Sequence, residues 1–174
     1  MKSAIVTGAN GFVGCALVKE LLSRNIKVCA VVRNNRTDRL PDHPLLKIVS
    51  CEMDNIGDLY KLIKPEQYEV FYHLAWAGST GNDRSDYSLQ LMNTKWSLDS
   101  VNAASLCGCK TFVGAGSLAE FDVNAYTPTD GAKPNSVSHY GTAKIATHYM
   151  TKAECNKVGI NHLWAYLTNT FGIG

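Results

Sequence analysis

Residues 7–14 of the chain read TGANGFVG, with a glycine at every third position. They follow a short β-branched run, SAIVT, and precede a segment with the apolar spacing of an amphipathic helix. At such a strand-to-helix turn, Gly8 allows a tight turn, Gly11 lets the backbone approach a pyrophosphate, and Gly14 lets the helix pack closely on the sheet. The helix N-terminus adds free N–H groups and a positive dipole end. The spacing differs from the usual fingerprint, but its place between strand and helix predicts dinucleotide binding.

The rest of the chain alternates short β-branched runs with longer segments of helical period. We expect strands at 3–7, 27–33, 46–49, 69–75, 110–116 and 162–168, and helices from residue 12 onward and at 56–63, 87–106 and 140–157. The runs are apolar at successive positions, as in strands that are buried on both faces. The sequence therefore predicts an α/β fold, a doubly wound, Rossmann-like parallel sheet with helices on both faces.

Three stretches rich in turn-forming residues are expected to be loops, namely 34–44, 77–86 and 121–139. The third is long for a compact domain, and such loops tend to be functional. With 174 residues and no internal repeat, the chain fits one dinucleotide-binding domain, residues 1–174.

Composition narrows the class of protein. Hydrophobic residues make up 45% of the chain and charged residues 18%, which suits a globular domain with a substantial core. The 17 Lys and Arg residues and 15 Asp and Glu residues form no basic run or acidic tail, so we expect neither a nucleic-acid nor a membrane partner. The N-terminus shows no signal-peptide pattern and no apolar run is long enough for a bilayer, which predicts a cytoplasmic protein.

The six cysteines are scattered through mostly apolar runs and form no CxxC pair. This favours buried free thiols in a reducing compartment over a disulfide framework. Cys107 and Cys109 have no second pair of Cys or His at ligand spacing, so no metal site is expected.

The strand expected at 27–33 ends in Arg33, at a point where dinucleotide-binding domains carry an acid that bonds the ribose 2′-hydroxyl. A guanidinium there suits a 2′-phosphate, so the sequence favours NADP over NAD. The alternative interpretation is that Arg33 only solvates the end of a strand.

Tyr140 and Lys144 lie four residues apart in an expected helix, on one face and within mutual reach. A free tyrosine has a pKa of about 10 and is a poor acid or base at neutral pH. A nearby ammonium favours the phenolate. The pair is therefore consistent with proton transfer by Tyr140, although the same spacing arises by chance in many helices.

Five motifs together resemble the extended short-chain dehydrogenase/reductase family, which contains the nucleotide-sugar epimerases and dehydratases. They are the glycine turn at 7–14, HLA at 73–75, Asn93 in MNTKWSL, Ser117 in AGSLAEFD, and the pair of Tyr140 and Lys144. The motifs appear in the family's order and span nearly the whole chain. In combination they are highly specific.

The resemblance implies a catalytic set of Ser117, Tyr140 and Lys144. Ser117 would hydrogen-bond the substrate oxygen, and Tyr140 would exchange a proton with that oxygen. Lys144 would hold the nicotinamide ribose and favour the tyrosine's phenolate form. Hydride would pass between a sugar carbon and the nicotinamide, so the protein mainly supplies positioning and electrostatics.

The resemblance also implies the contacts to NADP or NAD. Glu52 and Met53 match the pair that contacts adenine, although the family usually has Asp in place of Glu52. Asn93 resembles a buried asparagine of the long helix whose role is structural as often as catalytic. The expected cofactor-binding residues are Gly8, Asn10, Gly11, Phe12, Val13, Gly14, Arg33, Glu52, Met53, Leu74, Ala75, Trp76, Asn93, Tyr140 and Lys144.

Departures from the family pattern bear on the reaction. Sugar 4,6-dehydratases that resemble this chain carry acids just after the catalytic Ser or Thr, whereas Leu118 and Ala119 follow Ser117. Glu120 comes one position too late. We therefore expect epimerisation or 4-ketone reduction of a nucleotide sugar rather than loss of water, and the NADP preference favours a reductase.

A second departure lies at the end of the chain. Residues 166–174 resemble the family's RxxNxYGPG, but Tyr166 replaces the Arg and Ile173 replaces the Pro. Relatives continue beyond this point into a substrate-binding domain, which we expect these 174 residues to lack. Two alternatives stay open, reduction of a non-sugar carbonyl by the same residues and a truncated, non-catalytic dinucleotide-binding module. By analogy, helices 87–106 and 140–157 would pair two subunits in a homodimer.

Overall fold

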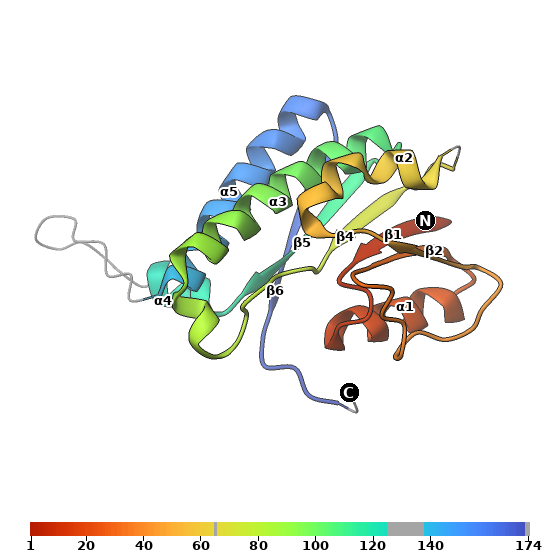
Figure 1. The fold of residues 1–174 in the computed structure, drawn as a ribbon. Coiled ribbons are helices and arrows are strands. Elements are labelled where there is room, and N and C mark those ends of the chain that lie inside the picture. Colours follow the sequence, from red (N-terminus) through yellow and green to blue (C-terminus); the bar gives the residue numbers. More distant parts are fainter. Residues whose placement is uncertain (65, 125–137, 173–174) are drawn as a thin grey trace, which may run out of the picture.

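The structure is a computed structural model that describes residues 1–64, 66–124 and 138–172, with the backbone alone at residues 122 and 124. Its centre is a six-stranded sheet (Figure 1). The strands are β1 (Ser3–Thr7), β2 (Lys27–Val32), β3 (Leu46–Ser50), β4 (Val70–His73), β5 (Thr111–Ser117) and β6 (Asn161–Leu167). All neighbouring strands pair in parallel, in the order β3-β2-β1-β4-β5-β6. The predicted doubly wound sheet is confirmed.

The strand order reverses between β1 and β4. The chain first winds outward from β1 to β2 and β3, then returns to place β4 on the other side of β1. Ligands of open α/β sheets bind at the carboxyl ends of the strands that flank such a reversal. The topology therefore marks the ends of β1 and β4, at Thr7 and His73, as the place to look for a site.

Helices cover both faces of the sheet (Figure 1). Helix α1 (Phe12–Ser23) packs on one face, and α2 (Leu59–Ile63), α3 (Tyr87–Leu106) and α5 (His139–Val158) pack on the other. Successive strand residues point to opposite faces. Ala4 and Val6 thus belong to the core under α1, and Ile5 belongs to the core under the other three helices.

Side-chain caps start the two long helices at the predicted places. The Asp86 carboxylate accepts from the Leu89 N–H at the start of α3, and the Ser138 hydroxyl accepts from the Gly141 N–H at the start of α5. Gly159, with φ +75°, ends α5 in the left-handed conformation that glycine adopts readily. These local signals explain why the predicted bounds of both helices agree closely with the structure.

The structure corrects three segment predictions. The helix expected at 56–63 is a 3₁₀-helix, η1 (Met53–Asp58), followed by the short α2. The expected loop at 77–86 contains a second 3₁₀-helix, η2 (Gly81–Ser85). The expected loop at 121–139 begins inside a helix, α4 (Ala119–Asn124), because Ser117 and Glu120 cap it reciprocally, and its residues 125–137 lie outside the described part of the chain.

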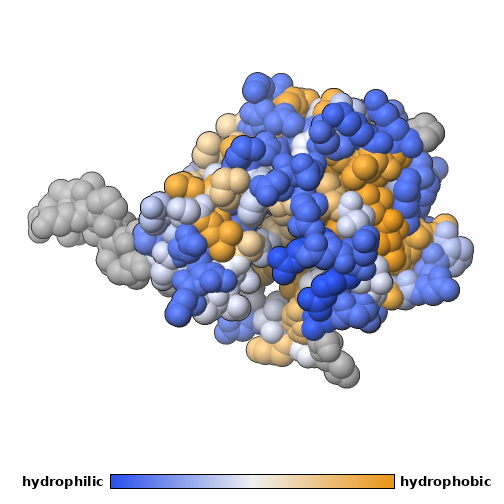
Figure 2. All heavy atoms as spheres, in the orientation of Figure 1, coloured by the Kyte–Doolittle hydropathy of each residue, from blue (hydrophilic) through white to orange (hydrophobic). Residues whose placement is uncertain are grey.

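The face of the molecule drawn in Figure 2 is mostly polar, and the cysteines lie inside the protein. Hydrophilic side chains cover most of the face drawn in Figure 2, with hydrophobic ones gathered in smaller patches. All six cysteines are buried free thiols. No helix within the described ranges is long and apolar enough to cross a membrane. The same ranges contain no group of three or more His, Cys, Asp or Glu side chains able to hold a metal ion.

Candidate functional site

A cleft of about 940 Å³ opens at the carboxyl ends of the strands, where the strand order reverses. Thr7 and Val32 end β1 and β2 in its wall, Leu74 follows β4, and Ala115 lies near the end of β5. Its volume lies in the upper part of the range of about 300–1,000 Å³ that is usual for ligand pockets. This is the candidate functional site.

The glycine turn between β1 and α1 forms one end of the cleft. Gly8 has φ +66°, and a Cβ there would lie 2.8 Å from the Ala75 backbone nitrogen. A Cβ on Gly14 would lie 2.9 Å from the Ala9 Cα, so the first turn of α1 fits against the loop only without a side chain. Gly11 is the N-cap of α1, and no side chain caps this helix end. Its first N–H groups are left for an anion, and the cradle fits a dinucleotide pyrophosphate.

A second part of the cleft is basic. Arg33, Arg36 and Arg39 all line it, and Arg33, expected as the last residue of the strand, lies directly after β2. The Arg36 guanidinium lies 3.6 Å from the Asp38 carboxylate. The Asn10 amide joins this loop to the glycine turn, because it donates to the Asp38 carboxylate at 2.8 Å and accepts from the Arg39 N–H at 3.0 Å. Sequence reasoning noted Arg33 alone, although all three arginines occur within seven residues.

A buried hydrogen-bond chain braces the middle of the cleft. The Ala75 N–H donates to the Thr7 hydroxyl at 3.3 Å, and that hydroxyl lies 3.0 Å from His73 Nδ1. His73 Nε2 lies 3.0 Å from the Ser97 hydroxyl, which donates to the Asn93 carbonyl. Because Ser97 already donates its hydroxyl hydrogen to the Asn93 carbonyl, the hydroxyl can only accept from His73. Nε2 must therefore carry the imidazole proton. Burial lowers the pKa of His73 to about 3, so the ring stays neutral around pH 7.

Asn93 holds the backbone behind the cleft wall. Its side-chain oxygen accepts from the Ala77 N–H at 2.9 Å, and its amide donates to the Ala77 carbonyl at 2.8 Å. Asn93 itself is buried, whereas Ala77 lines the cleft. The geometry therefore indicates a structural role for Asn93, which lies outside the cleft lining.

Tyr140 and Lys144 lie together behind another part of the wall. The Lys144 ammonium donates to the Ala115 carbonyl at 2.8 Å and lies 3.6 Å from the centre of the Trp76 ring. The Tyr140 ring meets the same Trp76 edge to face, at 5.9 Å between centroids. Burial lowers the pKa of Lys144 to about 7, and the negative charge of Glu120 opposes that shift. Trp76 and Ala115 both line the cleft, so the pair is one layer away from it.

Two charged residues near this pair were given no role from the sequence: Arg84 was not noted, and Glu120 was set aside as one position too late for an elimination acid. The Arg84 guanidinium of η2 lies 4.4 Å from the centre of the Tyr140 ring. Glu120 is fully buried and accepts a hydrogen bond from the Ser117 N–H at 2.8 Å. The Ser-x-x-Glu spacing of a capping box was a usable signal for Glu120. Nothing in the sequence indicated Arg84, because its partner Tyr140 lies in a helix over fifty residues away.

Twelve of the predicted cofactor-binding residues line the cleft. They are Gly8, Asn10, Gly11, Phe12, Val13, Gly14, Arg33, Glu52, Met53, Leu74, Ala75 and Trp76. Asn93, Tyr140 and Lys144 lie outside its lining, and so does Ser117 at the end of β5. Ser117 and Lys144 are joined through β5, since the Lys144 ammonium bonds the carbonyl two residues before Ser117.

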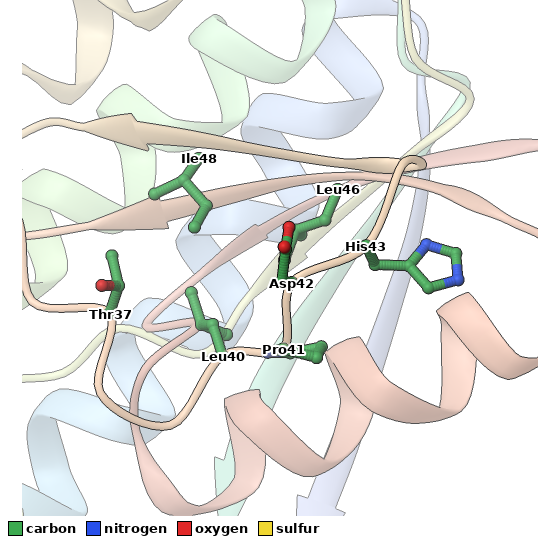
Figure 3. A pocket seen from close by; sticks show the side chains of 7 residues that line it. All are labelled: Thr37, Leu40, Pro41, Asp42, His43, Leu46 and Ile48. Carbon is green, nitrogen blue, oxygen red and sulfur yellow. The ribbon is translucent and has the colours of Figure 1, made fainter.

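A second, smaller pocket of about 240 Å³ lies in the segment between β2 and β3 (Figure 3). Its lining is Thr37, Leu40, Pro41, Asp42, His43, Leu46 and Ile48, which come from one loop and the edge strand β3. It is smaller than usual ligand pockets and lies away from the strand reversal. The larger cleft remains the candidate site.

Comparison with known proteins agrees with this geometry. The sequence model of the NAD dependent epimerase/dehydratase family matches residues 4–174. A dTDP-6-deoxy-L-talose 4-dehydrogenase (NAD(+)) of Aggregatibacter actinomycetemcomitans is 30% identical over 152 residues, which cover 80% of this chain and 50% of that protein. The chain thus spans about half the length of this relative.

Solved structures show the same fold. Epimerase Mth375 of Methanothermobacter thermautotrophicus superposes with a TM-score of 0.78 at 21% identity, over 99% of this chain and 53% of that one. The Bordetella bronchiseptica enzyme WbmH, solved in complex with NAD+, gives a TM-score of 0.74 at 22% identity, over 97% and 56% of the two chains. From the match over residues 4–174, the chain belongs to the NAD dependent epimerase/dehydratase family.

Proposed function

We propose that residues 1–174 are the dinucleotide-binding domain of an NAD(P)-dependent sugar-nucleotide epimerase or 4-ketoreductase. The observation that carries the proposal is the combination of a glycine cradle with the Tyr140/Lys144 pair one layer behind the same cleft. The relative of 30% identity acts on a dTDP-sugar, which supports a nucleotide sugar as the substrate class. Because the chain spans about half of that relative, we place the rest of the substrate pocket outside these residues.

We propose a place along the cleft lining for each part of the cofactor. The free N–H groups at the start of α1 suit the pyrophosphate, and Glu52 and Met53 suit the adenosine end. Arg33, Arg36 and Arg39 suit a 2′-phosphate, so NADP should bind more tightly than NAD. The relative named above uses NAD(+), which makes this preference a point to measure.

The chain's own residues would handle the proton. The bound nicotinamide would supply or accept a hydride. Tyr140 would give a proton to the substrate oxygen or take one from it, and Ser117 would donate a hydrogen bond to that oxygen. The Lys144 ammonium, held by the Ala115 carbonyl and the Trp76 face, would supply a positive charge beside them. Leu118 and Ala119 offer no acid for elimination, and Glu120 is already bonded inside the protein.

We also propose that α3 and α5 pair two subunits. Both helices carry exposed large hydrophobic side chains, Tyr87 and Leu91 on α3 and Tyr149 and Met150 on α5. The two helices pack against each other over much of their length, which would present these side chains on one layer. Sedimentation of the purified chain should give twice the monomer mass.

Cofactor binding tests the proposal directly. NADP and NAD should each be titrated into the wild type, Gly11→Val and Gly57→Ala. A Cβ at Gly11 would lie 3.0 Å from the Gly8 carbonyl oxygen, so a valine should fill the cradle and abolish binding. A Cβ at Gly57 would lie 3.9 Å from its nearest neighbour, so this control should bind like the wild type. Equal binding by all three proteins would refute the site.

A further inference from the structure

We propose that Glu120 is a positioning residue for the catalytic set, which fixes the backbone of Ser117 and supplies a compensating negative charge near Lys144. The inference rests on the function proposed above and extends it to a residue outside Ser117, Tyr140 and Lys144.

Glu120 is held in a fully enclosed polar pocket. Its side chain is 1% exposed. One carboxylate oxygen accepts from the Ser117 N–H at 2.8 Å, and the Trp164 indole N–H lies 3.1 and 3.2 Å from the two oxygens. His148 Nδ1 lies 3.6 Å from the second oxygen. A carboxylate is stable in such a place only where donors surround it, so this pocket is built for it.

The first of these bonds sets the geometry of Ser117. Ser117 and Glu120 form a capping box at the start of α4, in which the Glu120 carboxylate bonds the Ser117 N–H and the Ser117 hydroxyl bonds an N–H in the same turn. The Ser117 hydroxyl oxygen accepts from the Ala119 N–H at 3.2 Å. A hydroxyl has one hydrogen and two acceptor sites, so the Ser117 hydrogen is left to be donated to a substrate oxygen.

Two glycines in β5 make room for the pocket. A Cβ on Gly114 would collide with the Trp164 ring, and one on Gly116 would lie 2.5 Å from the indole nitrogen and 2.9 Å from the Glu120 carboxylate. His148 then stacks on the Trp164 ring, at 4.8 Å and 6°. Glycine weakens a strand interior, so its presence at both positions points to this packing requirement.

The carboxylate and the Lys144 ammonium bond the backbone of β5 two residues apart, at the Ser117 N–H and the Ala115 carbonyl, so the carboxylate also acts on Lys144. Glu120 raises the pKa of Lys144, against the larger lowering by burial. His73, whose pKa is lowered further by the Lys144 charge, stays neutral near pH 7 and so adds no charge beside the ammonium. Among the described residues, Glu120 is therefore the one whose charge favours the ammonium form of Lys144. Within the described residues, the titratable groups that interact with Lys144 are His73 and Tyr140, and those that interact with Glu120 are His148 and Tyr166. The Arg84 guanidinium lies behind them, against the Tyr140 ring.

The first experiment follows the Lys144 amine in the cofactor-free protein by NMR of labelled lysine, assigned with Lys144→Met. In Glu120→Gln, which keeps the size of the side chain and removes the charge, its titration should move to lower pH by about one unit. In Glu154→Gln, a control that loses a carboxylate which pairs with Lys157 on α5, it should stay in place. An unchanged titration in Glu120→Gln overturns the charge role.

The second experiment measures turnover of the full-length enzyme against pH. The active form needs the Lys144 ammonium, which is lost as pH rises. Glu120→Gln should therefore move the basic limb to lower pH and reduce kcat about 10- to 100-fold, with cofactor KM little changed. An unchanged basic limb and kcat would refute the proposal, as would a loss confined to KM.

A second variant, Trp164→Phe, separates the positioning role of Glu120 from its charge role. It also keeps the proposal testable if Glu120→Gln does not fold. It removes one donor to the carboxylate but keeps the charge. We expect an unchanged Lys144 titration and a lowered kcat, and a normal kcat overturns the positioning role. The NMR titration needs no cofactor or substrate, so it decides the Glu120–Lys144 coupling even if the proposed function is wrong.

Discussion

Replacing Lys144 by methionine should remove a pH-dependent loss of stability. The folded protein holds the Lys144 proton only up to a pKa of about 7, whereas an unfolded lysine holds it up to about 10.5. Between these values the unfolded chain binds more protons, so the free energy of unfolding of the wild type rises with pH. The burial of the charge costs about 5 kcal/mol well below pH 7, since each pKa unit corresponds to about 1.4 kcal/mol.

The predicted magnitude lies in the difference between the two proteins. Lys144→Met lacks this titration, so its free energy of unfolding relative to wild type should fall by about 2 kcal/mol between pH 7 and pH 9. The variant also loses the hydrogen bond to Ala115, but that loss lowers its free energy of unfolding by about the same amount at both pH values and cancels from the difference between them. Urea denaturation followed by circular dichroism measures it, with the exposed Lys152→Met as control. A difference that is constant across this range would show that the Lys144 pKa is not depressed and refute the reasoning.

Three further outcomes are expected. Arg33→Asp should reverse the proposed preference for NADP over NAD, as measured by cofactor titration, and a wild type that already prefers NAD would leave Arg33 as a surface charge. Tyr140→Phe in the full-length enzyme should reduce turnover about 10²- to 10⁴-fold with nearly normal cofactor affinity, and near-normal turnover would remove Tyr140 from the catalytic set. His73→Gln should flatten the acid side of the stability curve: the pKa of His73 falls from 6.5 to about 3 on folding, so the wild type loses stability as pH drops below 6.5. A wild type and variant with parallel stability curves from pH 4 to pH 7 would contradict that account.

The parts of the fold that depend on local pattern were predictable. The glycine turn, the β-branched runs and the capped long helices are each specified by residues within about twenty positions of one another. They were enough to predict the sheet and the glycine turn, and the family resemblance added the other predicted residues that line the cleft, such as Glu52 and Met53. Helix α4 was missed because its capping box directly precedes a stretch rich in turn formers, and the turn signal from residue 121 onward dominated the prediction.

The environment of the proposed catalytic set depends on contacts distant in sequence. Glu120 meets Trp164 across 44 residues, and the Lys144 ammonium bonds Ala115 across 29. The extent of Lys144 burial, and hence its pKa, also depends on the Trp76 ring. A Tyr/Lys spacing predicts that two side chains share a helix face. It carries no information on which partner shields the ammonium from water.

The packing of Trp164 on β5 constrains how this protein can change over evolutionary time. The indole occupies the space of two missing side chains, at Gly114 and Gly116, so an alanine at either position has no room while the tryptophan is present. Conversely, a smaller residue at 164 would open a void beside the strand and remove a donor from Glu120. Single replacements at these positions should therefore be disfavoured, and the four residues should change as a group. Among homologues, a side chain at position 114 should occur together with loss of the tryptophan.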